Sequence, residues 1–352
     1  MDLNARAKEA TDELLRTTPD VEQGWQSLRQ LRRRRRATRA GAVVAVLAVV
    51  GVGVGVQQLR PDSAPPVAAG PVFDANGALV GLSVDGDGQA AVTRASGKPT
   101  TQLPATAAGA FGPFQFTTDG STLIYTYDGK LRSRFLATGE DRAIYDCPDR
   151  TCNVAVSADG TQLAAWDGKT ITRGSMGGGS APPLAVGHEV IFAAWSPDGS
   201  RIAFSAYAGA YRQVAYFVVD VASGKVTRLG AVGGVPAAGP AWSPDGSSLA
   251  LLQAHGWDAV RDIDLVVLPT DGSDSTVLRS IGSCGCKRYN PAVTWSPDGD
   301  YIATTAVGQP DAHTVGGPVY AVHPDGSDWH QIADGRWVNH LAWQPVVDEA
   351  DK

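Results

Sequence analysis

The chain has 352 residues, of which 43% are hydrophobic and 19% are charged, and its formal net charge is −6. The apolar content is near the globular norm, which excludes a collagen-like or disordered chain. Four cysteines are too few for a disulfide-dense small domain, and the mild acidity argues against general nucleic-acid binding. The 41 Gly and 22 Pro residues predict many turns, and therefore short strands rather than long helices.

Residues 1–39 form a basic segment. They hold ten of the 30 Lys and Arg residues and six of the 36 Asp and Glu residues, so this segment carries a charge of +4 and the rest of the chain −10. Helical spacing of apolar residues and the start signal Thr18-Pro19 predict two short helices in a cytoplasmic tail. The residues that we expect to dock a cytosolic regulator are Leu14, Val21, Trp25 and Leu28. The alternative is a marginal tail whose arginines only set the topology.

The order of features in the first 55 residues carries a resemblance. A short acidic and apolar helix, a proline, a Trp-containing helix, an Arg run and an Ala/Val-rich segment follow one another. This order resembles actinobacterial membrane proteins that accompany extracytoplasmic-function sigma factors. Residues 1–39 contain no His or Cys, so the resemblance does not extend to the zinc-containing anti-sigma class. It implies a regulator that signals through this tail.

Residues 40–56 are entirely apolar, reading AGAVVAVLAVVGVGVGV. A helix of that length spans about 26 Å, close to the ~30 Å hydrocarbon thickness of a bilayer. We therefore predict one transmembrane helix over residues 40–59. Arginines crowd its N-terminal flank and only Arg60 stands on the other, so the positive-inside rule places the N-terminus in the cytoplasm. The alternatives are a cleaved signal peptide, which would need a shorter charged region and a cleavage site, and a buried soluble helix.

A repeat organises the region after a Pro-rich linker at residues 60–71. The sequence Trp-Ser-Pro-Asp-Gly ends at Gly199, Gly246 and Gly299, and weaker copies end at Gly120 and Gly160. A period near 40 to 50 residues, with apolar strands on both sides of each turn, predicts a β-propeller over residues 72–346. Residues 347–352 are predicted to be disordered. The repeat-defining structural residues are Trp195, Asp198, Gly199, Trp242, Asp245, Gly246, Trp295, Asp298, Gly299 and Trp343.

Each repeat residue has an expected role. The tryptophans are expected to pack between blades. The aspartates are expected to cap backbone N–H groups of their turns, with metal binding as the alternative. Five copies start five blades, and the last strand, near Trp343, is expected to join the N-terminal strands of residues 78–104. The predicted fold class is therefore all-β with six blades, or with seven if residues 72–76 form a strand of their own.

The Trp-Ser-Pro-Asp-Gly turns resemble the WD-like propeller of the TolB family. The resemblance covers residues 114–343, and residues 72–113 by inference. It implies the propeller fold and says little about function. TolB proteins carry an extra N-terminal domain where this chain has an anchor and a linker, so the partners of TolB are not carried over.

Strand order assigns the loops to two faces of the propeller. We call the side of the Asp-Gly turns the turn face, and the side of the longer loops and the connections between blades the loop face. Long loops on one rigid face are where propellers usually bind ligands or partners. The residues expected on the loop face are Tyr207, Tyr211, His255, Trp257, Asp258, Arg288, Tyr289, His313, Trp337 and His340. Each of them is also compatible with ordinary loop decoration.

All four cysteines lie in the propeller region. Cys147 and Cys152 bracket four residues of one connection and are expected to form a local disulfide. A bond between Cys284 and Cys286 would close a tight ring. A cross-disulfide or a four-Cys zinc site would need both loops to reach across the ring. We therefore expect no bound metal and no cofactor.

No catalytic motif is present: H-E-x-x-H, G-x-S-x-G and Walker A sequences are all absent. The sequence thus favours a non-enzymatic protein of the cell membrane, with a single span and an extracytoplasmic propeller. That propeller would bind, sense or scaffold a protein or an envelope ligand, and would not bind nucleic acid. One alternative is a sigma-factor-linked regulator. Another is an envelope hydrolase or lyase that uses Asp258, Asp262, His255 and His313 of the loop face.

Overall fold

The computed structural model describes residues 76, 78–84, 90–94, 99–101, 112–147, 152–176, 178–208, 213–255, 261–284, 291–306 and 317–345. The chain divides into two compact units, Met1–Asp62 and Ser63–Lys352, and every described residue lies in the second. The predicted tail with Leu14, Val21, Trp25 and Leu28, the membrane helix, the linker and residues 347–352 therefore lie outside the described residues. Within the described ranges, no helix is long and apolar enough to cross a membrane.

The described part of the second unit consists of strands, which confirms the predicted all-β class. Three sheets of four strands each come first along the chain after β3 (Pro99–Thr101). Their strands are β4 (Phe114–Phe116), β5 (Thr122–Tyr127), β6 (Lys130–Phe135) and β7 (Asp141–Asp146); β8 (Val154–Val156), β9 (Gln162–Asp167), β10 (Thr170–Ser175) and β11 (Ser180–Ala185); and β12 (Glu189–Trp195), β13 (Arg201–Tyr207), β14 (Val214–Asp220) and β15 (Val226–Arg228).

The two remaining sheets have five and seven strands. The first contains β16 (Val235–Pro236), β17 (Ala241–Trp242), β18 (Ser248–His255), β19 (Arg261–Pro269) and β20 (Thr276–Cys284). The second contains β21 (Val293–Trp295), β22 (Ile302–Thr305), β23 (Gly317–Val322), β24 (His330–Trp343), β1 (Leu79–Val84), β2 (Ala90–Arg94) and β3 (Pro99–Thr101), in that order.

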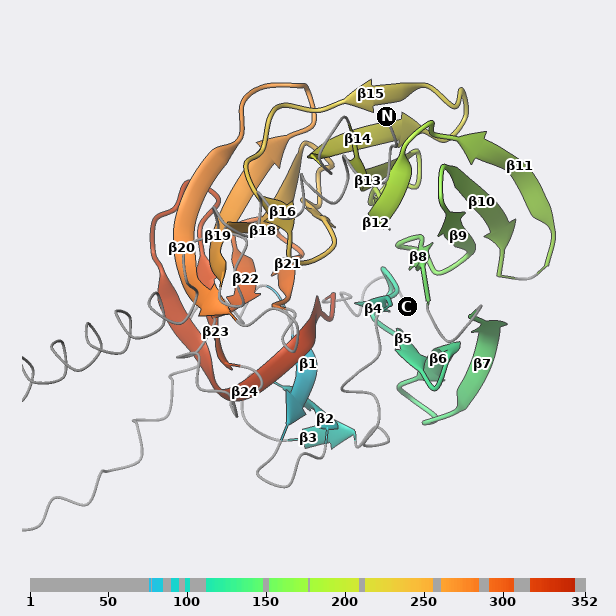
Figure 1. Ribbon diagram of the computed structural model, residues 1–352. Helices are drawn as coiled ribbons and strands as arrows, with labels where there is room; N and C mark the ends of the chain where they lie inside the picture. Colours follow the sequence, from blue (N-terminus) through green and yellow to red (C-terminus); the bar gives the residue numbers. More distant parts are fainter. Residues whose placement is uncertain are drawn as a thin grey trace, which may run out of the picture. The chain divides into compact units, whose positions relative to one another are not determined.

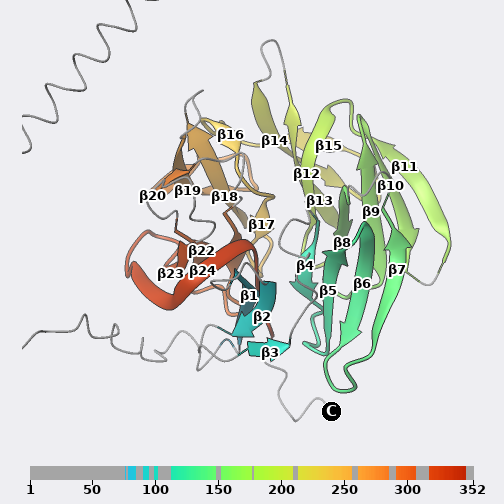
Figure 2. The same ribbon diagram turned by 60° about the horizontal axis from the view of Figure 1, so that its bottom comes forward.

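The five sheets surround a common centre as the blades of a propeller. Figure 1 shows β4, β8 and β12 closest to the centre, and β7, β11 and β15 at the rim. Figure 2 shows the sheets that contain β4 and β8 standing side by side. Each of the three four-stranded sheets is an antiparallel meander, so its strand order runs outward from the centre.

The seven-stranded sheet corrects the predicted blade count. Six separate blades were expected, but the described residues form five sheets. The reason lies in β24, which runs through 14 residues without a break. Its first half pairs with β23, for example Ala333 with Val319, and its second half pairs with β1, as Trp343 does with Leu79. The expected pairing of the last strand with the N-terminal strands is present, but it continues the preceding blade.

Short side-chain contacts close the ring between the chain ends. The Gln344 side chain donates to the Gly120 carbonyl at 3.0 Å, which ties the last strand to the turn after β4. On the other side, Asn76 is fully buried and its amide donates to the Asp298 carboxylate at 2.6 Å. The Asp298 N–H in turn donates to the Asn76 amide oxygen at 3.0 Å. These bonds fasten the segment that precedes β1 to the turn face.

The Ser-Pro-Asp-Gly turns are built by hydrogen bonds within each turn. In the turn after β12, the Ser196 hydroxyl and the Ser200 N–H donate to Asp198 at 2.6 and 3.1 Å. The Arg201 N–H donates to the Ser196 hydroxyl at 2.9 Å, which starts the next strand. Gly199 takes a φ of +68°, a region that side chains disfavour. The aspartate therefore acts on the backbone of its own turn.

These hydrogen bonds depress the pKa of Asp198 to about 2, with the Ser196 hydroxyl as the largest cause. A carboxyl whose pKa falls on folding adds stability above its unfolded value near 3.8, and that contribution is lost as the pH falls towards 2. We expect Asp198→Asn to flatten the loss of stability between pH 4 and pH 2, as measured by acid unfolding. Asp274→Asn is the control, since that exposed carboxylate accepts no hydrogen bond from the described residues. An equal flattening in both variants would contradict the assignment.

The repeat tryptophans connect neighbouring blades. The indole N–H of Trp195 donates to the Ala155 carbonyl of the preceding blade at 3.2 Å. Trp242 makes the same bond to Ala194 at 3.0 Å, and Trp295 makes it to Ala241 at 3.1 Å. All three side chains are buried. The tryptophan of each full repeat thus fixes the inner strand of its blade against that of the preceding blade.

Candidate ligand pocket at the centre of the loop face

A pocket of about 310 Å³ lies where the inner strands of all the sheets converge. Its walls are parts of these strands and the residues just before them. They comprise residues 112–115, 152–156, 192–195, 237–240, 291–293 and 340–341, together with Ala158 and Trp166. Because most of these residues precede the Asp-Gly turns, the pocket extends along the inner strands towards the loop face. We call it the central pocket.

The central pocket has no charged carboxylate, ammonium or guanidinium group in its described lining and is bordered mainly by small residues. Among the described residues that line it there is no Asp, Glu, Lys or Arg. Most of the lining is Ala, Gly, Pro or Val, so the backbone of the inner strands lies close to the pocket surface. A site of this kind favours an uncharged occupant, because a buried charge without a partner is costly.

Aromatic rings supply the larger surfaces of the central pocket. Phe114 stacks on His340, with ring centroids 5.3 Å apart. Phe192 and Trp166 also border the pocket. Trp166 is buried, and its indole N–H has no hydrogen-bond acceptor among the described residues. Flat apolar surfaces beside small residues suit a ligand with an apolar or aromatic group.

Gly112 is required where the chain enters β4. A Cβ atom there would lie 2.1 Å from the hydroxyl oxygen of Thr126 and 3.0 Å from the Cβ atom of Cys152. Thr126 and Cys152 are both buried, so neither can move aside easily. The glycine thus lets the wall of the central pocket pack against the next blade.

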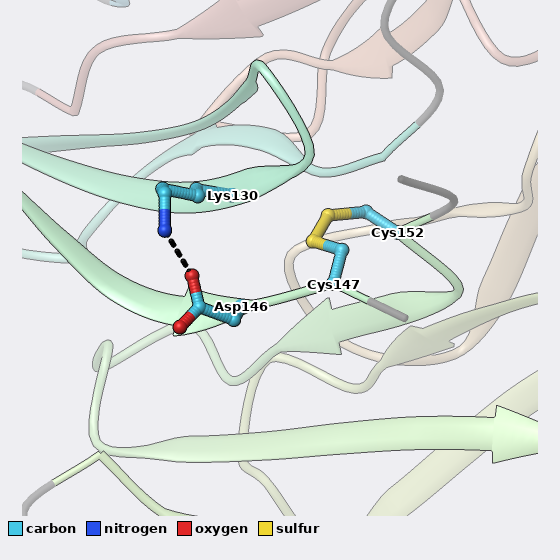
Figure 3. The surroundings of a disulfide bond; sticks show 4 residues. All are labelled: Lys130, Asp146, Cys147 and Cys152. Atoms are coloured by element: carbon cyan, nitrogen blue, oxygen red, sulfur yellow. Dashed lines mark hydrogen bonds and ion pairs between the residues drawn. A yellow bond between two sulfur atoms is a disulfide. The ribbon is translucent and has the colours of Figure 1, made fainter. Parts of the chain in front are cut away.

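A disulfide lies at the edge of the central pocket. Cys147 and Cys152 are bonded, with Cα atoms 4.9 Å apart, and Cys152 lines the pocket (Figure 3). Both cysteines are buried against Ile124 and Leu131. Beside them, Lys130 and Asp146 form an exposed ion pair across β6 and β7. The disulfide therefore fixes the connection between two blades next to the pocket.

Replacing both Cys147 and Cys152 by Ser is expected to lower the free energy of unfolding by about 2 kcal/mol. This is the chain-entropy value for a loop of about six residues. Urea unfolding measures it, and wild-type protein in a reducing agent should show a comparable loss. A change below about 0.5 kcal/mol, as at ordinary surface positions, would show that the bond does not constrain the fold.

The structure brings one of the predicted loop-face residues to the central pocket, namely His340. Tyr207 and His255 end β13 and β18, away from it. His255 pairs with Asp264, at 3.1 Å between Nε2 and Oδ2. The backbone of Trp337 lies in β24 opposite Ser83 and Gly317. Outside the described residues lie Tyr211, Trp257, Asp258, Arg288, Tyr289, His313 and Cys286, together with the side chain of Cys284.

Two further predictions concern chemistry. Two of the acid/base candidates are described: Asp262 accepts a hydrogen bond from the Ser283 hydroxyl, and His255 pairs with Asp264, so the two are not paired with each other. Within the described residues, no group of three or more His, Cys, Asp or Glu side chains could hold a metal ion. The carboxylates of the Asp-Gly turns are engaged by their own turns.

Phe114, Phe192 and the small residues of the pocket walls were missed by sequence reasoning. A signal for them exists, because most of them stand at a similar place in the repeat, a few residues before the repeated turn. Examples are Gly239 and Pro240 before Trp242, and Pro291 and Ala292 before Trp295.

Comparison with known proteins supports the fold. No protein-family model matches the chain. The Tol-Pal system protein TolB from several strains of Francisella tularensis is 36% identical over 76 residues, which is 22% of this chain. The match spans only 17% of the length of those relatives.

Solved structures extend the similarity beyond that segment. TolB from Acinetobacter baumannii superimposes with a TM-score of 0.59 at 17% identity, over 76% of this chain and 66% of that one. A putative TolB from Agrobacterium tumefaciens has a TM-score of 0.51 at 19% identity, over 76% and 98% of the two chains. The fold is a TolB-like β-propeller. A chain from a nidogen–laminin complex also matches, with a TM-score of 0.53 at 15% identity over 76% and 98%.

Proposed function

We propose that this TolB-like propeller is a binding module whose protein or envelope ligand engages the loop face at the central pocket. The observation that carries the proposal is the neutral pocket of about 310 Å³, to which every sheet contributes its inner strand. Its volume lies at the lower end of the range of ligand sites. The likeness to TolB proteins supports a binding or scaffold role for the fold.

The walls of the central pocket favour a segment of polypeptide as the occupant. The strands β4, β8, β12 and β21 stand at the end of their sheets and pair on one side only. Some carbonyls of these strands accept side-chain hydrogen bonds, as Ala155 and Ala194 do from the tryptophans. The remaining N–H and C=O groups of the other edges are available to an incoming chain, as on exposed strand edges elsewhere. The absence of charged lining residues among those described suits uncharged side chains on that segment.

Photo-crosslinking tests this proposal in living cells. p-Benzoylphenylalanine at Phe192 would place the reactive group in the central pocket, whereas the same group at Leu136, an exposed turn-face residue, serves as control. A partner captured from Phe192 and not from Leu136 is the expected result. Identical products from both positions, or none from Phe192, would contradict a binding role for the pocket.

We further propose that the propeller lies outside the cytoplasm, held by the apolar segment of residues 40–59. The disulfide supports this, because structural disulfides persist in oxidising compartments. Protease added to spheroplasts should then degrade the propeller and spare a small N-terminal fragment. A propeller that survives until the membrane is lysed would overturn the topology.

A further inference from the structure

A second cavity, of about 280 Å³, lies on the loop face between the blade of β12–β15 and the blade of β16–β20. Its lining comes from the start of β14 at Gln213, the end of β15 at Arg228, and the connection of residues 230–234. We call it the Arg228 cavity. Figure 1 shows β14 and β15 beside β16, which this connection joins to them.

Arg228 differs from the other arginines of the propeller. Those with described side chains each have a partner: Arg132 and Arg134 face Asp141, Arg142 and Arg279 lie over the rings of Phe135 and Trp329, Arg173 donates to the Pro182 carbonyl, and Arg201 donates to the Gly246 carbonyl. Arg228 is exposed at the end of β15 and has no ion pair, hydrogen bond or ring contact of this kind within the described residues. An unpaired guanidinium beside a cavity is a ready anion ligand.

The connection of residues 230–234 adds backbone donors. No hydrogen bond among the described residues uses the N–H groups of this segment as donor. Its position is nevertheless fixed. A Cβ atom at Gly230 would lie 2.4 Å from the Ser273 carbonyl, and the Ser275 hydroxyl donates to the Ala231 carbonyl at 2.9 Å. Gly234 has a φ of +83° and would meet the Ala254 carbonyl at 2.7 Å if it carried a Cβ atom. The glycines thus let the backbone pack closely against the next blade.

The lining of the Arg228 cavity therefore offers mainly hydrogen-bond donors. It has a guanidinium, the Gln213 amide and free N–H groups, and there is no Asp or Glu in its lining. Oxyanions match such a set, because charge-assisted hydrogen bonds from a guanidinium fork and from backbone N–H groups are the stronger kind.

We propose that the Arg228 cavity binds an oxyanion, a carboxylate or a phosphate, carried by the ligand of the loop face. Arg228 holds two oxygens of the anion, and Gln213 and the N–H groups of residues 230–234 complete the site. The assignment of the anion to that ligand rests on the proposed function, which it deepens by naming a charged group on the ligand. The inference that the cavity binds an anion does not depend on the proposed function.

Isothermal titration of the purified full chain with inorganic phosphate and with succinate, at constant ionic strength, tests the proposal. We expect saturable binding of at least one probe. Arg228→Gln should weaken it about ten-fold or more, since hydrogen bonds to charged groups contribute about 1.5–3 kcal/mol. Gln213→Ala should weaken it less. Lys225→Gln is the matched control, because it removes a charge from the same hairpin outside the cavity.

The outcomes separate the sources of the anion. Binding of phosphate alone indicates a phosphorylated ligand, binding of succinate alone indicates an acidic one, and binding of both supports a general oxyanion site. No saturable binding, or equal loss in Arg228→Gln and Lys225→Gln, would overturn the proposal. Crosslinking from Phe192 does not depend on this result, so failure here and failure of the binding function are distinguishable.

Discussion

Removal of residues 341–352 is expected to unfold the propeller. The deletion takes away Leu341, Ala342 and Trp343, all buried, which pair with Gly81, Val80 and Leu79 of β1. Loss of one large buried side chain typically costs about 2–5 kcal/mol. Two are lost here together with a strand pairing, against a total stability of about 5–15 kcal/mol for a typical domain.

The truncated chain should be insoluble or should lack a cooperative melting transition by circular dichroism. Removal of residues 347–352 alone is the matched control, because it leaves β24 whole, and it should behave as the wild type. A cooperative transition within a few degrees of wild type in the longer truncation would show that the ring does not depend on its last strand.

Replacement of Trp195 by Ala is expected to cost about 3–5 kcal/mol, the range for a buried aromatic side chain. Trp195 is buried among Ile202, Phe204 and Ala155, and it donates to the Ala155 carbonyl of the preceding blade. Trp195→Phe keeps a ring in place and loses the hydrogen bond, worth about 1 kcal/mol. Urea unfolding of the three proteins separates packing from hydrogen bonding.

Trp329→Ala is the control, because the Trp329 indole donates no hydrogen bond to a neighbouring blade within the described residues. Trp329 is only partly buried, stacks on Tyr320 of its own blade with ring centroids 4.7 Å apart, and lies under Arg279 of the neighbouring blade. We expect it to cost about 1–2 kcal/mol, consistent with the loss of an aromatic pair and some area. A cost for Trp329→Ala equal to that of Trp195→Ala would show that the bond between blades carries no special weight.

The fold was predictable from the repeat, because each full copy combines a turn that its own side chains stabilise with a tryptophan that is buried. Ser196, Asp198 and Gly199 act within six residues of one another, so their pattern is visible in one segment of sequence. The path of β24 was not predictable. Asp334-Gly335 is typical of a turn, yet the backbone there continues as strand, because β23 and β1 pair with its two halves.

The candidate site was less predictable than the fold. The central pocket depends on residues from all the sheets, which only the closed ring brings together, and its lining is mostly Ala, Gly and Pro, which carry no chemical signal. His340 stood out because it is titratable, whereas its stacking partner Phe114 did not. Arg228 was missed for a different reason: nothing in the sequence shows that an arginine lacks a partner.

The pairing of β1 with β24 also has a kinetic consequence. Contacts between residues close in sequence form early, whereas joining distant segments carries a larger loop-closure cost. The four-stranded meanders of β4–β15 can assemble as the chain emerges. β1 can pair with β2 at once, but its other edge has no partner until β24 has been synthesised as far as Trp343. The ring therefore closes last, and until then one edge of β1 is open to mispairing with other chains.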